Sequence, residues 1–347
     1  MRDLFINKEL SIKEAIKKLD ETARKILLIV EDNKLIGVLT DGDIRRWILK
    51  SGNLSEPVSL IMIKEPKYIF EDERKNAKKV LKEYNIEAVP VLNKEKEIVD
   101  IIFWNDNFNR KFKFNKMDNP VVIMAGGKGT RLDPYTKILP KPLIPIGDIP
   151  IVERIINRFN EYGCNNFYMT VNYKKNMIKA YFNEIQKSYT IEYIEEEKPL
   201  GTAGSLYLLK DKIIDTFFLI NCDILIEGNY SDMLKYHKGN KAKITLITSL
   251  KHYTIPYGVI QINGDSDVKK MTEKPGYDFL VNTGMYILEP EVINDIPENE
   301  FFHITDLIND YINNGEKIGV YPVSEGSWLD MGQFKEMEIM LERLGVK

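Results

Sequence analysis

The sequence predicts an α/β protein built from two parts, and three observations lead to this prediction. Its 347 residues exceed the roughly 100–200 residues of an ordinary domain, so two domains are expected. Residues 1–115 contain an internal repeat, with copies at about 1–60 and 61–115. Over residues 120–347, apolar strand patterns alternate with helical patterns, which is typical of a mixed, mostly parallel sheet covered on both faces.

The composition indicates a soluble, globular protein. Hydrophobic residues make up 44% of the chain and charged residues 29%, which suffices for a sizeable core. Lysine and arginine (49) nearly balance aspartate and glutamate (52), which argues against a nucleic-acid or membrane-surface binder. Cys164 and Cys222 lack metal-ligand spacing and are expected to be buried free thiols. Because charged residues follow Met1 and no apolar run reaches the roughly 18 residues of a membrane span, we expect a cytoplasmic protein.

The first repeat begins with helical spacing of apolar residues from Ile12 to Leu19. A strand at 26–30, a turn at Asp32 and Asn33, and a second strand at 35–39 follow. About 62 residues later the same order recurs as a helix at 77–81 and strands at 89–92 and 97–102. Two such units are expected to pack on each other.

The phrase GVLTDGDIRR at 37–46 resembles the CBS module, named after cystathionine β-synthase, which occurs in pairs and often binds adenine nucleotides. The resemblance implies that Thr40 and Asp43 contact the phosphate and ribose of a regulatory adenine or guanine nucleotide, beside the free N–H groups of a helix N-terminus. In the second copy, Phe103 replaces the threonine and Asp100 the glycine, while Asp106 keeps the carboxylate, so at most one such site is expected. The alternative is a dimerisation or docking module in which Asp43 is a helix N-cap.

Residues 108–120 are polar and cationic and end in Asn-Pro, which disfavours helix at Asn119, so they are predicted to be a linker. Thr305 with Asp306 is predicted to cap a late helix. The elements predicted before that helix are strands at 121–125, 167–172, 190–196, 216–222 and 242–250, and helices near 150–162, 174–187, 202–210 and 231–239. In such a sheet, ligands bind at the carboxyl ends of the strands.

The first of these strands runs into a glycine-rich loop, VVIMAGGKGTRL at 121–132. Glycines let backbone N–H groups approach a phosphate closely, so the loop is a candidate phosphate site. The Walker template GxxxxGK[ST] does not occur in the sequence. The dinucleotide template GxGxxG would place its third glycine at Leu132, which disfavours a Rossmann dehydrogenase.

AGGKGTRL at 125–132, followed by PKPLIPIG at 140–147, resembles the signature of the sugar-1-phosphate nucleotidyltransferases. The resemblance covers residues 120–347 and implies a Rossmann-like, mixed and mostly parallel sheet domain behind a tandem CBS module. Further family motifs follow in order: PLGTAGSL at 199–206, NCD at 221–223, YGVI at 257–260, EKP at 273–275, NTG at 282–284 and WLDMG at 328–332.

The resemblance implies attack by a sugar-1-phosphate oxygen on the α-phosphorus of a nucleoside triphosphate, with release of pyrophosphate. Because this nucleophile is already ionised, catalysis depends on positioning and charge neutralisation. The resemblance assigns Lys128, Arg131 and Lys141 to the triphosphate. It assigns Asp223 and Asp330 to Mg²⁺, which favours one or two carboxylates together with phosphate oxygens.

The remaining site residues are also carried over from the family. Glu273 and Lys274 are expected to bind the sugar and its phosphate. The other residues assigned to substrate are Ala125, Gly126, Gly127, Gly129 and Thr130 on the loop, and Gly258, Asn282, Thr283 and Gly284 in the sugar pocket.

Base choice is assigned to Glu196, five residues before Gly201, with Glu197 as an alternative. Gly201 itself is also assigned to the substrate. A carboxylate accepts the adjacent N1–H and N2–H donors of guanine together, whereas uracil and thymine offer one N–H between carbonyls. GTP is therefore the expected nucleotide. If residues 195–197 are instead a solvated strand end, UTP or CTP remains open.

No residue type decides the sugar. A CBS pair ahead of this catalytic domain resembles the guanylyltransferases that use glucosamine-1-phosphate in bacterial legionaminic acid synthesis. Mannose-1-phosphate and heptose-1-phosphate are the alternative sugars. The alternative function, of a different class, is an inactive CBS protein that senses nucleotides. We expect a homodimer or higher homo-oligomer.

The three histidines lack the spacing of metal ligands and are not expected to bind zinc or act as a base: His237, His252 and His303.

Overall fold

The computed structural model describes the chain except for residues 23, 51, 85, 105–114, 265 and 347. The chain folds as two compact units, Met1–Lys116 and Met117–Lys347. The end of the predicted linker belongs to the second unit, because the Met117 N–H donates to the Tyr162 carbonyl at 2.8 Å. The buried Asn119 amide likewise donates to the Thr216 carbonyl at 2.7 Å. Within the described residues, no helix is long and apolar enough to cross a membrane.

The first half of the first unit has the predicted helix, strand, turn and strand. Its sheet has the order β1-β2-β3, with β1 and β2 parallel and β2 and β3 antiparallel. Asp32 and Asn33 join β2 to β3 with φ of 50° and 63°, the left-handed pair that a tight hairpin needs. The elements are β1 (Phe5–Ile6), α1 (Ile12–Thr22), β2 (Ile26–Glu31), β3 (Lys34–Thr40) and α2 (Asp41–Leu49).

The second half repeats this topology, which confirms the internal repeat. Its sheet has the order β4-β5-β6, again with one parallel and one antiparallel pair. Ala88 and Ile101 of this half join the core of the first half, so the two halves share buried surface. The elements are β4 (Ile69–Phe70), α3 (Ala77–Glu83), β5 (Ala88–Leu92) and β6 (Ile98–Phe103).

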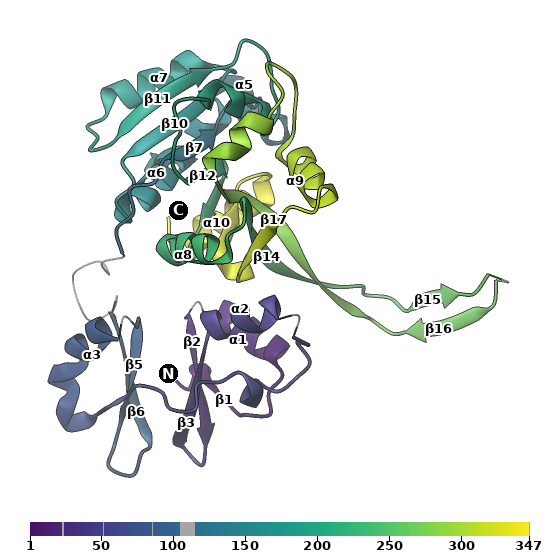
Figure 1. Cartoon of the computed structure of the whole chain (residues 1–347). Coiled ribbons are helices and arrows are strands. Elements are labelled where there is room, and N and C mark those ends of the chain that lie inside the picture. The colour runs from purple at the N-terminus through teal and green to yellow at the C-terminus, as the bar shows by residue number, and fades with distance from the viewer. Residues whose placement is uncertain (23, 51, 85, 105–114, 265, 347) are drawn as a thin grey trace. The chain divides into compact units, whose positions relative to one another are not determined.

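The second unit is built on a central sheet with the order β11-β10-β7-β12-β17-β14-β18 (Figure 1). β17 is antiparallel to both neighbours, and the other pairs are parallel, so the predicted mixed, mostly parallel sheet is confirmed. β17 and β18 have no counterpart among the predicted strands. The strands are β7 (Val121–Met124), β10 (Asn166–Val171), β11 (Thr190–Glu195), β12 (Phe217–Asn221), β14 (Ile244–Thr254), β17 (Gly276–Leu288) and β18 (Ile318–Val323).

Helices cover both faces of this sheet. Successive side chains of a strand point to opposite faces, so apolar side chains on both faces have to be covered. On one face, Phe159 of α6 packs edge-on against Phe167 and Phe218, with ring centroids 6.5 and 5.3 Å away. The next residues, Tyr168 and Leu219, face the opposite side and share a core with α9. The helices are α5 (Tyr135–Ile138), α6 (Ile151–Glu161), α7 (Lys175–Glu184), α8 (Tyr230–Asn240), α9 (Ile304–Asn313) and α10 (Phe334–Arg343).

Two local predictions are wrong. The helix predicted at 202–210 is a 3₁₀ turn, Gly204–Leu209. α9 is capped by His303, whose N–H donates to Asp306 Oδ2 at 3.2 Å, so Thr305 lies inside the helix.

The two cysteines, Cys164 and Cys222, are buried free thiols as predicted, and burial raises the pKa of each to about 12.

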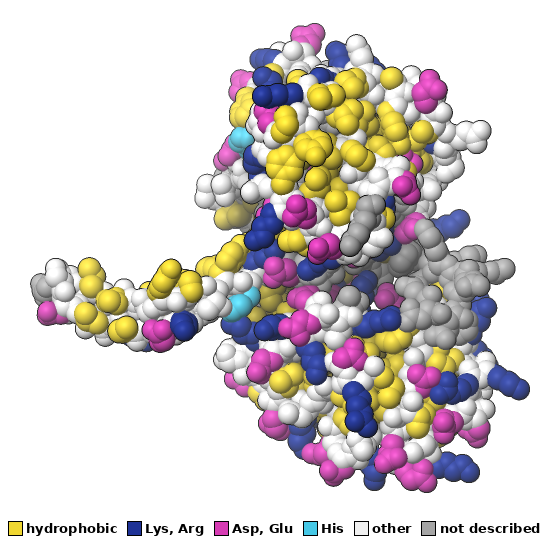
Figure 2. Space-filling view, turned by 180° about the vertical axis from the view of Figure 1, so that it is seen from behind, with side chains coloured by type: hydrophobic (Ala, Val, Ile, Leu, Met, Phe, Trp, Pro, Cys, Tyr) yellow, Lys and Arg dark blue, Asp and Glu magenta, His cyan; other side chains and the backbone are white. Residues whose placement is uncertain are grey.

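β14 and β17 continue past the central sheet and lead into the antiparallel hairpin β15 (Val259–Ile262) and β16 (Val268–Thr272). Figure 1 shows this extension projecting from the body of the second unit. We call residues 251–279 the arm. Hydrophobic side chains are exposed along it (Figure 2).

The buried side chain of His237 should make the free energy of unfolding depend on pH. His237 is fully buried between Thr245 Oγ1 (2.7 Å) and Glu289 Oε1 (3.0 Å). Burial lowers the pKa of His237 below its ordinary 6.5, although Glu289 opposes this shift. The unfolded chain therefore binds the proton first, and the free energy of unfolding should fall as the pH drops below about 6.5.

We expect H237Q to reduce the slope of unfolding free energy against pH by up to about 1.4 kcal/mol per pH unit in this range. Urea unfolding at a series of pH values measures the slope. H252Q, at an exposed histidine, is the control. An identical slope in H237Q and the wild type would contradict the assignment.

Candidate active site

The glycine loop follows β7 at the carboxyl edge of the sheet. It is anchored at Ala125, which is buried and donates its N–H to the Thr170 carbonyl at 3.0 Å. No atom lies within 4 Å of the place where a Cβ of Gly127 would stand, so the loop faces open space there. Gly129 has φ +69°, and a Cβ at this residue would lie 2.9 Å from Lys141 Cβ. Glycine at this position therefore allows the loop to lie directly against Lys141.

The loop presents two cations to solvent. Lys128 and Arg131 are exposed, as is Thr130 between them. Neither cation has a hydrogen-bond or ion-pair partner in the part of the chain that the structure describes. Two charged groups without a protein partner on a glycine loop are available to a polyanionic ligand.

Two carboxylates meet beside this loop because two short strands pair. Asp223 comes directly before β13 (Ile224–Ile226), and Asp330 ends β19 (Trp328–Asp330). In the antiparallel β13/β19 pair, Ile224 lies opposite Asp330, and the Met331 N–H donates to the Asp223 carbonyl at 2.8 Å. Residues far apart in the sequence are thus brought to one place.

Lys141 completes this cluster. It lies on the 3₁₀ turn Lys141–Leu143, is only 8% exposed, and its ammonium forms an ion pair with the Asp223 carboxylate. Burial raises the pKa of Asp330, and the negative charge of Asp223 raises it further. The Gly332 N–H, at 2.8 Å from Asp330 Oδ1, opposes this shift, as do the charges of Lys141 and Arg131. The structure therefore brings together four of the predicted residues: Arg131, Lys141, Asp223 and Asp330.

The donor set of this cluster fits a divalent cation that prefers oxygen. Two partly buried carboxylates repel each other. Among the described residues, the Gly332 N–H is the one hydrogen-bond donor to the Asp330 carboxylate. Mg²⁺ is held by one or two carboxylates, with water and substrate phosphates completing six ligands. Within the described residues, no group of three or more histidine, cysteine or acidic side chains is arranged for a metal. Phosphate oxygens and water would therefore have to supply the other ligands.

Glu196 lies directly behind the glycine loop. It is only 5% exposed, and a Cβ at Gly126 would be 2.9 Å from its Oε1. Burial raises its pKa, against hydrogen bonds from the Leu200 N–H and from the Thr170 and Ser205 hydroxyls. The solvated strand end considered for residues 195–197 is therefore wrong for Glu196.

Its neighbours do face solvent. Glu195 is exposed and forms ion pairs with Lys175 and Lys179, which lower its pKa to about 2. Glu197 is exposed as well. Of the three glutamates, Glu196 is thus the one whose side chain is in contact with the glycine loop.

Gly201 has a packing role that sequence reasoning missed. Its φ is +81°, and a Cβ there would lie 2.5 Å from the Phe302 carbonyl oxygen. That oxygen accepts the Ala203 N–H at 3.0 Å, and the Phe302 N–H donates to the Leu200 carbonyl at 3.0 Å. The glycine therefore holds the segment after Glu196 against the segment that leads into α9.

The NTG motif forms a bulge in β17. Asn282 pairs with Thr248 and Met285 with Ile247, so Thr283 and Gly284 are the extra residues. Thr283 is buried, and its hydroxyl donates to the Ile247 carbonyl at 2.7 Å.

The bulge lies against the end of β12. A Cβ at Gly284 (φ +86°) would be 2.5 Å from Asn221 Nδ2. Asn221 comes two residues before Asp223, so the bulge adjoins the carboxylate cluster. Asn282 donates to the Tyr286 hydroxyl at 2.6 Å and is exposed.

The remaining predicted sugar residues lie on the arm. A Cβ at Gly258 would be 3.0 Å from Glu273 Oε2, and the Lys274 N–H donates to the Tyr257 carbonyl at 3.3 Å. These residues adjoin β15 and β16, which form a two-stranded sheet among the described residues. Glu273 and Lys274 are exposed, and no described contact joins them to the Lys141 cluster. The structure therefore groups Gly258, Glu273 and Lys274 together but does not bring them to the other site residues.

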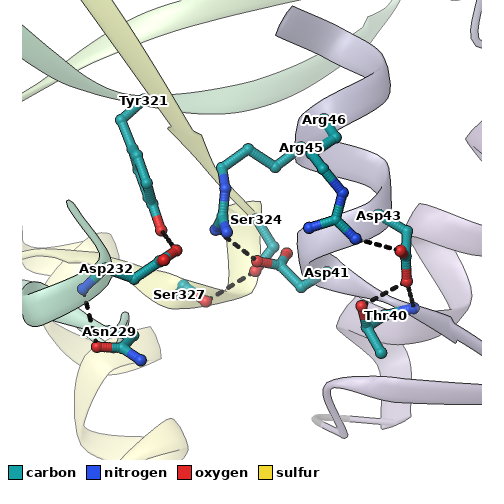
Figure 3. A network of polar contacts seen from close by, with 10 residues as sticks. All are labelled: Thr40, Asp41, Asp43, Arg45, Arg46, Asn229, Asp232, Tyr321, Ser324 and Ser327. Carbon is teal, nitrogen blue, oxygen red and sulfur yellow. Dashed lines mark hydrogen bonds and ion pairs between the residues drawn. The ribbon is translucent and has the colours of Figure 1, made fainter. Parts of the chain in front are cut away.

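In the first unit, Thr40 and Asp43 bond to each other (Figure 3). Asp43 Oδ2 accepts the Thr40 N–H at 2.9 Å and the Thr40 hydroxyl at 2.5 Å, while Oδ1 pairs with Arg46. Thr40 is therefore the N-cap of α2 and Asp43 its third residue, so the prediction of Asp43 as the N-cap is wrong.

The matching positions of the second repeat differ. Asp100 accepts a hydrogen bond from Arg74 Nη1 at 2.7 Å. The guanidinium of Arg24 lies 4.2 Å from the centroid of the Phe103 ring. Asp106 lies outside the described residues.

Comparison with known proteins gives two family matches. Residues 120–342 match the nucleotidyl transferase family, and residues 1–50 match the CBS domain. The crystal structure of HddC from Yersinia pseudotuberculosis superposes with a TM-score of 0.52 over 65% of this chain and 99% of that chain. Its sequence identity is 23%, so this likeness supports the fold alone.

Two curated relatives illustrate the sequence similarity. The mannose-1-phosphate guanyltransferase of Schizosaccharomyces pombe is 31% identical over 225 residues, which are 62% of this chain and 61% of that protein. The bifunctional protein GlmU of Methanococcus maripaludis strain C5 is 34% identical over 220 residues, 61% of this chain and 51% of that protein. The chain thus spans between about half and three fifths of the length of these relatives.

The packing of Gly201 gives a stability prediction. In G201A, the new Cβ meets a backbone oxygen that is held by hydrogen bonds, and a left-handed φ is strained as well. In the control G315A, φ is +73° but nothing lies within 4 Å, so only the strain of about 1–2 kcal/mol is expected. Urea unfolding should show G201A to be less stable than G315A by about 2 kcal/mol. Equal losses would show that Gly201 has no close contact with Phe302.

Proposed function

The chain belongs to the nucleotidyl transferase family, and from this premise we propose that it is a Mg²⁺-dependent sugar-1-phosphate nucleotidyltransferase. The observation that carries the proposal is the meeting of three features at the carboxyl edge of one sheet. These are an open glycine loop, two cations that have no partner in the described part of the chain, and the cluster of Lys141, Asp223 and Asp330.

The proposed reaction joins a sugar-1-phosphate oxygen to the α-phosphorus of a nucleoside triphosphate and releases pyrophosphate. Backbone N–H groups of the loop, with Lys128 and Arg131, hold the triphosphate, and Lys141 neutralises charge that develops at the α-phosphate. Asp223 and Asp330 would hold Mg²⁺, which supplies positive charge to the phosphate oxygens when it is bound. No protein base is needed, because the sugar phosphate is already ionised.

For the nucleotide we propose GTP. Glu196 lies in contact with the loop at Gly126, and a carboxylate there would accept the adjacent N1–H and N2–H donors of guanine. A relative named mannose-1-phosphate guanyltransferase supports this choice. UTP and CTP are the alternatives.

For the sugar we propose glucosamine-1-phosphate, as in bacterial legionaminic acid synthesis. The support is the architecture, since a CBS match over residues 1–50 precedes the catalytic unit. Mannose-1-phosphate and heptose-1-phosphate are the alternatives.

For the first unit we propose that residues 1–115 form a tandem CBS module with a role in assembly. The mutual bonding of Thr40 and Asp43 favours assembly over nucleotide sensing, because their polar atoms already have partners within the unit.

A panel of substrates tests this function directly. Pyrophosphate release by the purified full chain should be fastest with GTP and glucosamine-1-phosphate, and EDTA should abolish it. ATP, UTP and CTP, each with glucosamine-, mannose- and heptose-1-phosphate, complete the panel. If no pair of substrates releases pyrophosphate, the proposed function is wrong.

Two variants test the site. D223N and K141A should each lower kcat by at least about 100-fold, because each removes a charge that stabilises the transition state. Both should remain folded but less stable, since each leaves one buried charge without its partner. Pyrophosphate release and circular dichroism separate the two effects. K137A, at an exposed lysine of α5, is the matched control, and near-normal turnover in K141A or D223N would contradict the site.

A further inference from the structure

Asn172 and Tyr173 follow β10 directly, at the carboxyl edge of the central sheet. β10 pairs with β7, which leads into the glycine loop, and with β11, which ends at the residue before Glu196. The two residues therefore leave the sheet between two segments of the proposed nucleotide site. We call residues 172–173 the brace.

Tyr173 contacts the glycine loop and the short helix that follows it. Its N–H donates to the Gly126 carbonyl at 3.5 Å, and its hydroxyl donates to the Thr136 carbonyl at 3.0 Å. The stretch between Gly126 and Thr136 carries the two exposed cations Lys128 and Arg131. One residue thus holds both ends of this stretch, because the phenol side chain is long enough to reach from one end to the other.

Thr136 passes this support on to the middle of the stretch. It is 1% exposed, and its hydroxyl lies 2.6 Å from Asp133 Oδ1 and 3.1 Å from the Gly129 carbonyl oxygen, both of which are acceptors. A Cβ at Gly129 would be 3.0 Å from Thr136 Cγ2. Gly129 lies between Lys128 and Arg131 in the sequence. A shift of Thr136 would therefore move the backbone that presents both cations.

Asn172 holds the segment that carries Glu196. Its side-chain amide donates to the Glu196 carbonyl at 2.7 Å, and the Glu196 N–H donates to the Val171 carbonyl at 3.0 Å. The backbone of Glu196 is thus fixed on both sides of its Cα. Its carboxylate reaches back to the loop, where a Cβ at Gly126 would be 2.9 Å from Oε1. The brace therefore sets the position of Glu196 relative to the glycine loop.

Ordering the loop in advance should favour nucleotide binding. A glycine-rich backbone loses more conformational freedom on ordering than any other. If the loop became ordered only when the nucleotide bound, this loss would weaken binding. Bonds that order the loop beforehand remove that cost, and they also keep its N–H groups and cations in place for the charge that develops in the transition state.

We propose that Asn172 and Tyr173 are positioning residues of the nucleotide site. Tyr173 orders the glycine loop for the triphosphate, and Asn172 fixes Glu196 where its carboxylate reads the base. In this role both residues act through the loop and Glu196 rather than by contact with the substrate. The inference rests on the proposed function of these two segments.

Kinetics of Y173F in the full chain tests the role of Tyr173. This variant keeps the ring and removes the bond to the Thr136 carbonyl. The KM for the preferred nucleotide should rise about fivefold, as expected for the loss of one hydrogen bond, while the KM for the sugar phosphate stays unchanged. An unchanged nucleotide KM overturns the role of Tyr173.

Y162F is the matched control. The Tyr162 hydroxyl also donates to a backbone carbonyl, that of Gly228, at 2.8 Å, and Gly228 follows β13 rather than the glycine loop. Y162F should lower the free energy of unfolding but keep the nucleotide KM of the wild type. If Y162F raises the nucleotide KM as much as Y173F does, the effect of Y173F is a general loss of stability, and the proposal is wrong.

Hydrogen exchange tests the loop without any turnover. In the full chain without substrates, the amide protons of residues 126–136 should exchange faster in Y173F than in the wild type and in Y162F. Equal exchange in the three proteins overturns the role of Tyr173. A wild type that releases no pyrophosphate with any substrate pair refutes the proposed function instead, so the two proposals fail separately.

N172A tests the fixing of Glu196. The measured quantity is the ratio of kcat/KM between the preferred nucleotide and the next best one. We expect this ratio to fall about fivefold in N172A, because the base reader is no longer held. Y173F should keep the wild-type ratio, since every nucleotide has the triphosphate that the loop binds. A wild-type ratio in N172A overturns the role of Asn172.

Discussion

The interaction on which this structure depends is the close approach of two carboxylates, Asp223 and Asp330, beside the buried ammonium of Lys141. A buried charge is tolerated only with a partner, and removal of one partner typically costs about 3–5 kcal/mol. Lys141 neutralises one negative charge of the pair and leaves the other. That residual negative charge suits a metal ion and a triphosphate bound together, next to Lys128 and Arg131, two cations without an ion-pair partner among the described residues. The cluster would therefore account for both the triphosphate binding and the divalent-cation dependence that we propose.

The backbone supports this arrangement at a few positions where a side chain would not fit. Gly129 lets the loop lie against Lys141, and Gly284 lets the β17 bulge lie against Asn221 at the end of β12. Gly201 performs a similar task at the segment behind Glu196. The β13/β19 pair then fixes the two carboxylates in register. Apart from the contact of Gly129 with Lys141, these contacts join segments distant in sequence, so the arrangement exists only when the sheet has formed.

Much of the fold follows from local patterns, because the strands and helices around β7, β10 and α6 have clear periodicity. The sequence also singled out the four residues that the structure brings together, Arg131, Lys141, Asp223 and Asp330, because they belong to specific motifs. The burial of Glu196 and the contact of Gly201 with Phe302 were beyond it, because both depend on pairing between distant segments. The arm was not predicted for a related reason: the motif that holds Glu273 and Lys274 identifies residue types but not the course of the strands on either side of it.

The central claim is that Asp223 and Asp330 hold a divalent ion against the triphosphate beside Lys141. The most direct measurement is anomalous diffraction from crystals of the full chain grown with Mn²⁺ and a non-hydrolysable GTP analogue. We expect one strong manganese peak between the two carboxylates and a phosphate oxygen, with the triphosphate along the glycine loop. A manganese peak away from both carboxylates, or a triphosphate bound elsewhere, would contradict it.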